Sequence, residues 1–168
     1  RRFLPFCCTQ FLGAFNDNVY KNALIIMLAF HAASLTTLSA GTLVNLCAGL
    51  FILPFFLFSA TAGQLADKYD KSTIIRYVKV FEIGIMALGA IGFLHRNLAL
   101  QIGALFLMGL HSTIFGPVKY AILPQHLRND ELVGGNGLVE MGTFLAILLG
   151  TVVGGVLAAQ EHSATLVA

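Results

Sequence analysis

The chain has 168 residues, of which 57% are hydrophobic and 11% are charged, and its formal net charge is +2. A soluble domain usually carries about 25% charged residues, so this composition indicates an integral membrane protein. The basic residues are spread along the chain rather than clustered, so we expect no nucleic-acid partner.

Five stretches are long and apolar enough to cross a bilayer, which takes about 20 mostly apolar residues. The predicted spans cover residues 3–30, 41–62, 73–94, 98–122 and 132–159. Residues 164–168 are expected to begin a sixth span. The links are short, so consecutive helices should be antiparallel neighbours and the fold class is all-α. Since the chain begins with arginine instead of methionine, we expect a fragment whose true start lies upstream.

The first span carries a polar cluster in an otherwise apolar helix. Asp17 and Lys21 stand four residues apart and share a helix face, and Asn18 and Asn22 repeat that spacing on a second face. Asp17 lies roughly 22 Å along the helix, near mid-membrane. Polar residues at this depth usually face a bundle interior or a cavity and mark a functional site. An ion pair within the helix is the alternative, but it leaves the asparagines unexplained.

Residues 63–72, with the sequence GQLADKYDKS, are predicted to link the second and third spans. Gly63 is expected to end the second helix, and Asp67 to cap the next turn or pair across a helix interface. Lys79 and Glu82 follow in the first turns of the third span. Their spacing of three residues predicts a local ion pair.

The fourth span contains His111 and closes with Lys119. No residue with metal-ligand spacing accompanies His111, so we expect a neutral, hydrogen-bonded histidine and no metal site. Lys119 has two interpretations. Its side chain either extends to the lipid headgroups at the membrane surface or forms an electrostatic clamp for a phosphate in a cavity.

The fifth span holds Glu140 at a depth of about 13 Å, with Asn136 one turn earlier on the same face. No cation in the same helix can pair with Glu140. Its partner is therefore Lys21, Lys119 or a basic residue outside this chain, or else burial keeps the carboxyl protonated. An interhelical hydrogen bond that only holds the bundle together is a further alternative. Gly150 and Gly154 later in this span have the spacing of closely packed helices.

Basic residues in the short links predict the orientation of the bundle. The richer side holds Arg1, Arg2, Lys68, Lys71, Arg76 and Arg128. The opposite side holds only Arg96. The N-terminus is therefore expected to be cytoplasmic.

Several segments resemble a known family. Residues 63–72 resemble the signature loop of the major facilitator superfamily, although Asp70 stands where that pattern prefers glycine. The segments GAFNDN (13–18), FGPVKYAILPQ (115–125) and NGLVEMGTFLAILLGTVVGGVLA (136–158) are similar to its bacterial lysophospholipid transporters. The opening of the chain, up to Leu24, is most similar to members fused to an acyltransferase and an acyl-acyl carrier protein synthetase.

The resemblance implies a fold and a function. The chain would supply, at residues 1–168, an incomplete N-terminal six-helix half of a carrier in the bacterial inner membrane. The carrier would move lysophospholipid, especially lysophosphatidylethanolamine, to the inner leaflet for reacylation by alternating access. The implied partners are this substrate, membrane lipids, the missing C-terminal half and, in a fusion, the acyltransferase and acyl carrier protein. No cofactor is implied.

The resemblance also implies site residues. Asp17, Lys119 and Glu140 match the family's buried charges in its first, fourth and fifth helices. The predicted substrate-binding residues are Asp17, Asn18, Lys21, Lys119, Asn136 and Glu140. The predicted gating loop contains Gly63, Asp67, Lys68 and Lys71.

Three other functions are alternatives to lysophospholipid transport. A carrier for a drug or metabolite would use the same fold. A membrane anchor would not need charges at mid-membrane depth. An enzyme within this segment is not expected, because the spacing of His126 and Asp130 matches an acyltransferase only superficially. The parent chain could still carry catalytic domains.

Overall fold

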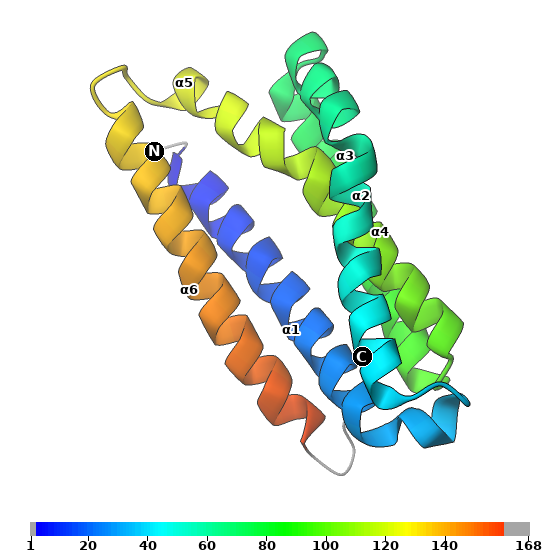
Figure 1. Ribbon diagram of the computed structural model, residues 1–168. Coiled ribbons are helices and arrows are strands. Elements are labelled where there is room, and N and C mark those ends of the chain that lie inside the picture. The colour runs from blue at the N-terminus through cyan, green and yellow to red at the C-terminus, as the bar shows by residue number, and fades with distance from the viewer. Residues whose placement is uncertain (1–2, 160–168) are drawn as a thin grey trace.

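The computed structural model describes residues 3–159, without the side chains of residues 31–35, and its regular structure in that range is helical (Figure 1). The helices are α1 (Phe3–Leu35), α2 (Ala40–Lys68), α3 (Lys71–Leu94), α4 (Leu98–Ala121), α5 (Leu123–His126) and α6 (Leu132–Ala158). The five long helices run up and down the bundle, which confirms the all-α fold class.

Within residues 3–159, four helices are long and apolar enough to cross a membrane, namely α2, α3, α4 and α6. α1 is the longest helix, with 33 residues, but the polar residues between Asn16 and Asn22 lower its hydropathy. α1 is therefore as long as a membrane-crossing helix requires, but its polar residues distinguish it from α2, α3, α4 and α6. The predicted start of a sixth span at 164–168 lies outside the described residues.

The link between α2 and α3 is shorter than predicted, because α2 continues through Gly63 to Lys68. A glycine ends a helix when it adopts a positive φ, and no glycine in the part of the chain that the structure describes does so. Asp70, not Asp67, caps α3, since its carboxylate accepts a hydrogen bond from the Thr73 amide at 2.7 Å. Hydrogen bonds from Thr73 hold the pKa of Asp70 below its usual range.

The bundle divides into two groups of helices (Figure 1). α1 and α6 lie side by side, and α2 and α3 both pack on α4. A Cβ atom at Gly150 would lie 2.6 Å from the carbonyl oxygen of Phe15, and one at Gly154 would lie 2.6 Å from that of Val19. Only glycine permits this approach, so the predicted close packing at this pair of glycines is confirmed.

The apolar core lies towards one end of the bundle. Its buried residues are Tyr20, Leu24, Leu28, Leu43, Cys47, Ile85, Phe93, Ala104, Leu105 and Met108. They belong to the later turns of α1 and α3 and the early turns of α2 and α4, near the turn from α3 to α4. The Tyr20 hydroxyl closes this end further by donating to the carbonyl of Gln101 at 3.0 Å. The opposite end, where α1 and α6 begin, is less tightly filled and contains the site.

Candidate functional site

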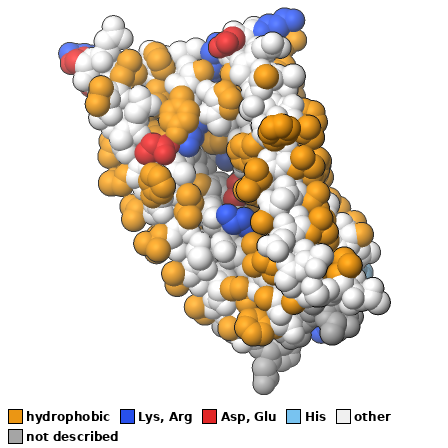
Figure 2. Space-filling model, viewed as in Figure 1, with side chains coloured by type: hydrophobic (Ala, Val, Ile, Leu, Met, Phe, Trp, Pro, Cys, Tyr) orange, Lys and Arg blue, Asp and Glu red, His pale blue; other side chains and the backbone are white. Residues whose placement is uncertain are grey.

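A cavity of about 350 Å³ lies between the α1–α6 pair and the group formed by α2, α3 and α4. Figure 2 shows it as a hollow with basic and acidic side chains in its wall, on a face otherwise rich in apolar side chains. Its polar lining includes Gln10, Asp17, Asn18, Lys21, Lys79, His111, Ser112, Lys119 and Thr143. Its apolar lining includes Phe51, Phe55, Phe115 and Ile147. The structure therefore brings together four of the predicted site residues, Asp17, Asn18, Lys21 and Lys119.

Asp17 and Lys21 of α1 form no ion pair with each other. Oδ2 of Asp17 accepts a hydrogen bond from the Ser112 hydroxyl of α4 at 3.1 Å, and the buried Oδ1 has no partner among the described residues. The Lys21 ammonium lies 5.1 Å from the ring centre of Phe51 on α2, which is a cation–π contact. Neither residue forms an ion pair with a described side chain, so the alternative of an ion pair within the helix is wrong. We call Asp17 and Lys21 the open pair.

The asparagines of α1 have different environments. Asn18 lines the cavity, and its amide nitrogen donates to the carbonyl of Ala14 at 2.8 Å. Its Oδ1 is buried and receives no hydrogen bond from the described part of the chain. Asn22 instead donates to the Thr151 hydroxyl of α6 at 3.1 Å, and so helps to hold α1 against α6. Only Asn18 of these two is therefore placed to contact a ligand.

Three polar residues that were not among the predicted site residues lie beside the open pair. They are Lys79, Glu82 and His111. The predicted ion pair is confirmed, with 2.6 Å between Nζ of Lys79 and Oε2 of Glu82. Glu82 is the twelfth of the 24 residues of α3, so the ion pair lies at mid-helix rather than in the first turns. Nε2 of His111 is 3.3 Å from the same Glu82 oxygen.

His111 differs from the hydrogen-bonded histidine that we expected. Its side chain is buried and its ring stacks on Phe115 at 6.0 Å. The contact with Glu82 is close but not aligned as a hydrogen bond, and neither ring nitrogen has a hydrogen-bond partner within the described ranges. A charged residue at the middle of an apolar helix, as at Glu82, is the sequence signal that could have identified this part of the site.

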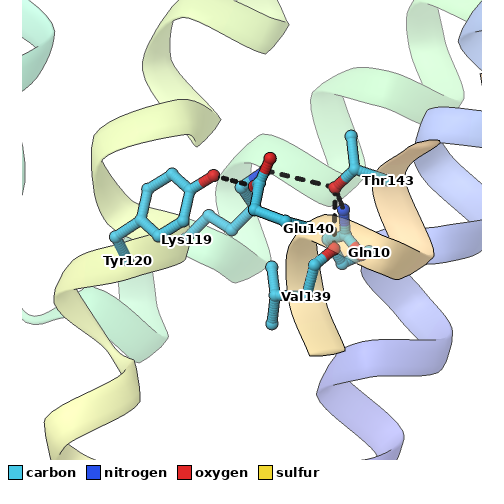
Figure 3. A network of polar contacts seen from close by, with 6 residues as sticks. All are labelled: Gln10, Lys119, Tyr120, Val139, Glu140 and Thr143. Carbon is cyan, nitrogen blue, oxygen red and sulfur yellow. Dashed lines mark hydrogen bonds and ion pairs between the residues drawn. The ribbon is translucent and has the colours of Figure 1, made fainter. Parts of the chain in front are cut away.

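Lys119 and Glu140 connect α4 to α6 (Figure 3). Nζ of Lys119 lies 3.4 Å from Oε1 of Glu140, and the Tyr120 hydroxyl donates to the same oxygen. Lys119 also contacts the Thr143 hydroxyl at 3.5 Å, and this hydroxyl accepts a hydrogen bond from Gln10 of α1. Of the partners considered for Glu140, Lys119 is therefore the correct one. We call Lys119 and Glu140 the bridge pair.

The bridge pair occupies the edge of the cavity. The Lys119 side chain is 12% exposed and reaches across to α6, so the extension to the membrane surface is wrong. The Glu140 side chain is 41% exposed, and only Lys119 of the two belongs to the cavity lining. Glu140 thus contacts the cavity through its partner.

The remaining predicted residues lie apart from this cavity. Asn136 is exposed near the start of α6 and does not belong to the lining formed by the described residues. Gly63, Asp67 and Lys68 lie in the last turns of α2, and Lys71 begins α3. These residues are at the end of the bundle where α1 begins, so their roles in binding and gating stay predictions.

Comparison with known proteins connects this architecture to one family. The Major Facilitator Superfamily profile matches residues 6–166. The lysophospholipid transporter LplT of Klebsiella pneumoniae (strain 342) is 31% identical over 170 residues, covering 98% of this chain and 38% of that protein. LplT of Salmonella typhimurium is 35% identical over 162 residues, covering 95% of this chain and 37% of that protein.

The chain thus spans less than two-fifths of the length of these curated relatives. No solved structure matches it. The family profile covers nearly the whole chain, and the four apolar helices agree with it. The chain therefore crosses the membrane several times and belongs to the Major Facilitator Superfamily.

Proposed function

We propose that the intact protein is a carrier that moves lysophospholipid, chiefly lysophosphatidylethanolamine, across the bacterial inner membrane for reacylation. The cavity carries this proposal, because it combines the open pair with an aromatic wall of Phe51, Phe55 and Phe115. A lysophospholipid has a charged headgroup and one acyl chain, so it requires both kinds of lining. The similarity to the lysophospholipid transporters LplT supports the same substrate class.

The open pair is arranged to bind the two charges of a zwitterionic headgroup. The Asp17 carboxylate and the side-chain oxygen of Asn18, Oδ1, are acceptors for an ammonium. The Lys21 ammonium lies one helical turn further along α1, and it attracts the phosphate as a point charge. Lys119 adds a second positive charge, held in place by Glu140. Asn136, exposed one turn before Glu140, is proposed as a contact at the entrance.

Transport would occur by alternating access around this cavity. The packed core closes the bundle near the turn from α3 to α4, and the cavity lies nearer the other end. Basic residues at the end of α2 and the start of α3 favour a cytoplasmic location for that other end. We propose that Gly63, Asp67, Lys68 and Lys71 help to close it.

The rest of the fold is proposed to follow the family. α1 would be the first of five complete spans, a sixth would begin at 164–168, and a C-terminal half would complete the cavity. From the opening residues we propose that the parent polypeptide also carries an acyltransferase and an acyl-acyl carrier protein synthetase. Acyl carrier protein would then be a further partner.

The test is transport of labelled lysophosphatidylethanolamine by the full-length protein in vesicles. A hydrogen bond to a charged group contributes about 1.5–3 kcal/mol, so Asp17→Asn should lower the rate by about tenfold or more. Asp130→Asn is the matched control, because Asp130 is exposed and pairs only locally with Arg128 at 2.8 Å. An unchanged rate in Asp17→Asn would contradict the proposed site. Equal transport of an unrelated solute without competition from lysolipid would instead favour another kind of carrier.

A further inference from the structure

Buried polar atoms without partners gather at the cavity. Across residues 3–159, the buried side-chain atoms that lack a hydrogen bond are Oδ1 of Asp17, Oδ1 of Asn18, Oε1 of Gln101 and both ring nitrogens of His111. Asp17, Asn18 and His111 all line the cavity. Native proteins pair nearly all buried polar groups, so an unpaired group requires an explanation such as a ligand. Three residues that line one cavity share this property.

The position of His111 determines which of its nitrogens is an acceptor. Nε2 lies 3.3 Å from Oε2 of Glu82, and the same oxygen accepts a hydrogen bond from Lys79 at 2.6 Å. A carboxylate paired with an ammonium is ionised and offers only acceptors. In the tautomer that carries its hydrogen on Nε2, this hydrogen faces the carboxylate and Nδ1 is an acceptor.

The surroundings of His111 hold its ring in place in the cavity lining. The residue is 2% exposed, and its ring stacks on Phe115 with an interplanar angle of 10°. The next residue of α4, Ser112, donates to Asp17. Consecutive residues of α4 thus face α3 and α1, and His111 lines the same cavity as the acceptors of α1.

We propose that His111 is a specificity-determining residue, whose Nδ1 accepts a hydrogen bond from the primary ammonium of the substrate headgroup together with Oδ1 of Asp17 and Oδ1 of Asn18. This inference rests on the proposed function. A primary ammonium has three N–H donors and no acceptor, which matches three acceptors of which one is charged. A trimethylated ammonium has no N–H donor and would leave all three acceptors unsatisfied. Sites built to hydrogen-bond a group reject analogues that lack it.

Two variants of His111 separate its two nitrogens. In His111→Gln the amide nitrogen can take the place of Nε2 beside Glu82, while the acceptor at Nδ1 is lost. In His111→Asn the amide oxygen can replace Nδ1 as the acceptor. Gln101→Met is the control for a purely structural effect, because Gln101 is a buried polar residue of α4 that lies outside the cavity lining drawn from the described residues.

The experiment uses the full-length protein in vesicles and lysolipids whose ethanolamine nitrogen carries no, one, two or three methyl groups. In the unmodified protein, the rate should fall with each methyl group, by at least about tenfold over the series. His111→Gln should reduce that ratio by about tenfold, whereas His111→Asn and Gln101→Met should preserve it. The ratio is informative even where a variant lowers the amount of folded protein.

Two results would overturn the role of His111. One is an unmodified protein whose rate is insensitive to methylation, and the other is a His111→Gln variant that retains the full ratio. If His111→Gln does not accumulate in the membrane, His111→Phe keeps the ring on Phe115 and removes both nitrogens, and the same ratio decides. Failure of the proposed function is distinguishable, because the unmodified protein would then transport none of the four lysolipids.

Discussion

The open pair and the bridge pair each consist of one acidic and one basic residue. Within the described residues, however, only the bridge pair forms an ion pair. Asp17 and Lys21 are one turn apart in a single helix, yet they contact α4 and α2 respectively. Lys119 and Glu140 lie 21 residues apart, yet their side chains meet at 3.4 Å. Contacts between neighbouring helices therefore decide which buried charges pair. Charges that pair hold helices together, and charges that do not pair within the bundle are available to a ligand.

The rotation of each helix explains this difference. α1 lies between α6 and the group formed by α2, α3 and α4, so residues on one of its faces reach different neighbours (Figure 1). Asp17 turns towards Ser112, and Lys21 turns towards the ring of Phe51. Lys119 and Glu140 instead lie on the facing sides of α4 and α6. Sequence spacing predicts contacts within a helix, but it carries no information on these rotations.

The largest contrast is expected when the lysine of each pair is replaced by methionine in the full-length protein. Lys21→Met removes a proposed phosphate contact, so transport of lysophosphatidylethanolamine should fall by about tenfold or more. Its thermal stability should change little, because no ion pair with a described residue is lost. Transport rate and melting temperature are measured on the same preparation. A normal rate, or a loss of stability without a loss of transport, would remove the distinction between the two pairs.

Lys119→Met should have its main effect on stability. It leaves Glu140 without its ammonium partner, and because that carboxylate is 41% exposed we expect a cost of about 1 kcal/mol. Combining Lys119→Met with Glu140→Gln should recover much of this loss, because no unpaired charge remains. A double-mutant cycle of melting temperatures measures the coupling. Additive effects of the two substitutions would show that the bridge pair does not hold α4 to α6.

The smallest expected effect concerns two aspartates near the junction of α2 and α3. Asp70 caps α3 and Asp67 is exposed near the end of α2, so Asp70→Ala should lower stability and Asp67→Ala should not. The pKa of Asp70 is held below its usual range, so its carboxylate stabilises the fold at neutral pH. This contribution is lost as the pH falls below about 3.9 and through the lower folded pKa.

Melting temperatures between neutral pH and about pH 3 would test this prediction. The gap between the unmodified protein and Asp70→Ala should narrow as the pH falls. Asp67→Ala is the matched control, and its gap should stay near zero at every pH. An equal effect of both substitutions would contradict the assignment of Asp70 as the N-cap of α3.

Much of the fold follows from the sequence, because hydropathy and helix length are local properties. Four of the predicted spans correspond to α2, α3, α4 and α6, and the cluster of Asp17, Asn18 and Lys21 lines a cavity as predicted. Gly63 shows a limit, since a glycine ends a helix only in a conformation that the surroundings must favour. His111 shows another limit, because its neighbours Glu82 and Asp17 come from two other helices. The sequence limits the candidate partners of Glu140 to a few residues, but only the packing of α4 against α6 shows that the partner is Lys119.

The most direct measurement is protection of the cavity by substrate, using a version of the full-length protein without its native cysteines. Ala14 lines the cavity beside Asn18, and Leu138 is exposed on α6 outside the lining formed by residues 3–159. A water-soluble thiol reagent would label Ala14→Cys and Leu138→Cys with and without lysophosphatidylethanolamine. If the open pair binds the headgroup, the lysolipid should slow labelling of Ala14→Cys severalfold and leave Leu138→Cys unchanged. Unaltered labelling of Ala14→Cys at saturating lysolipid, or equal protection of both positions, would contradict binding at the open pair.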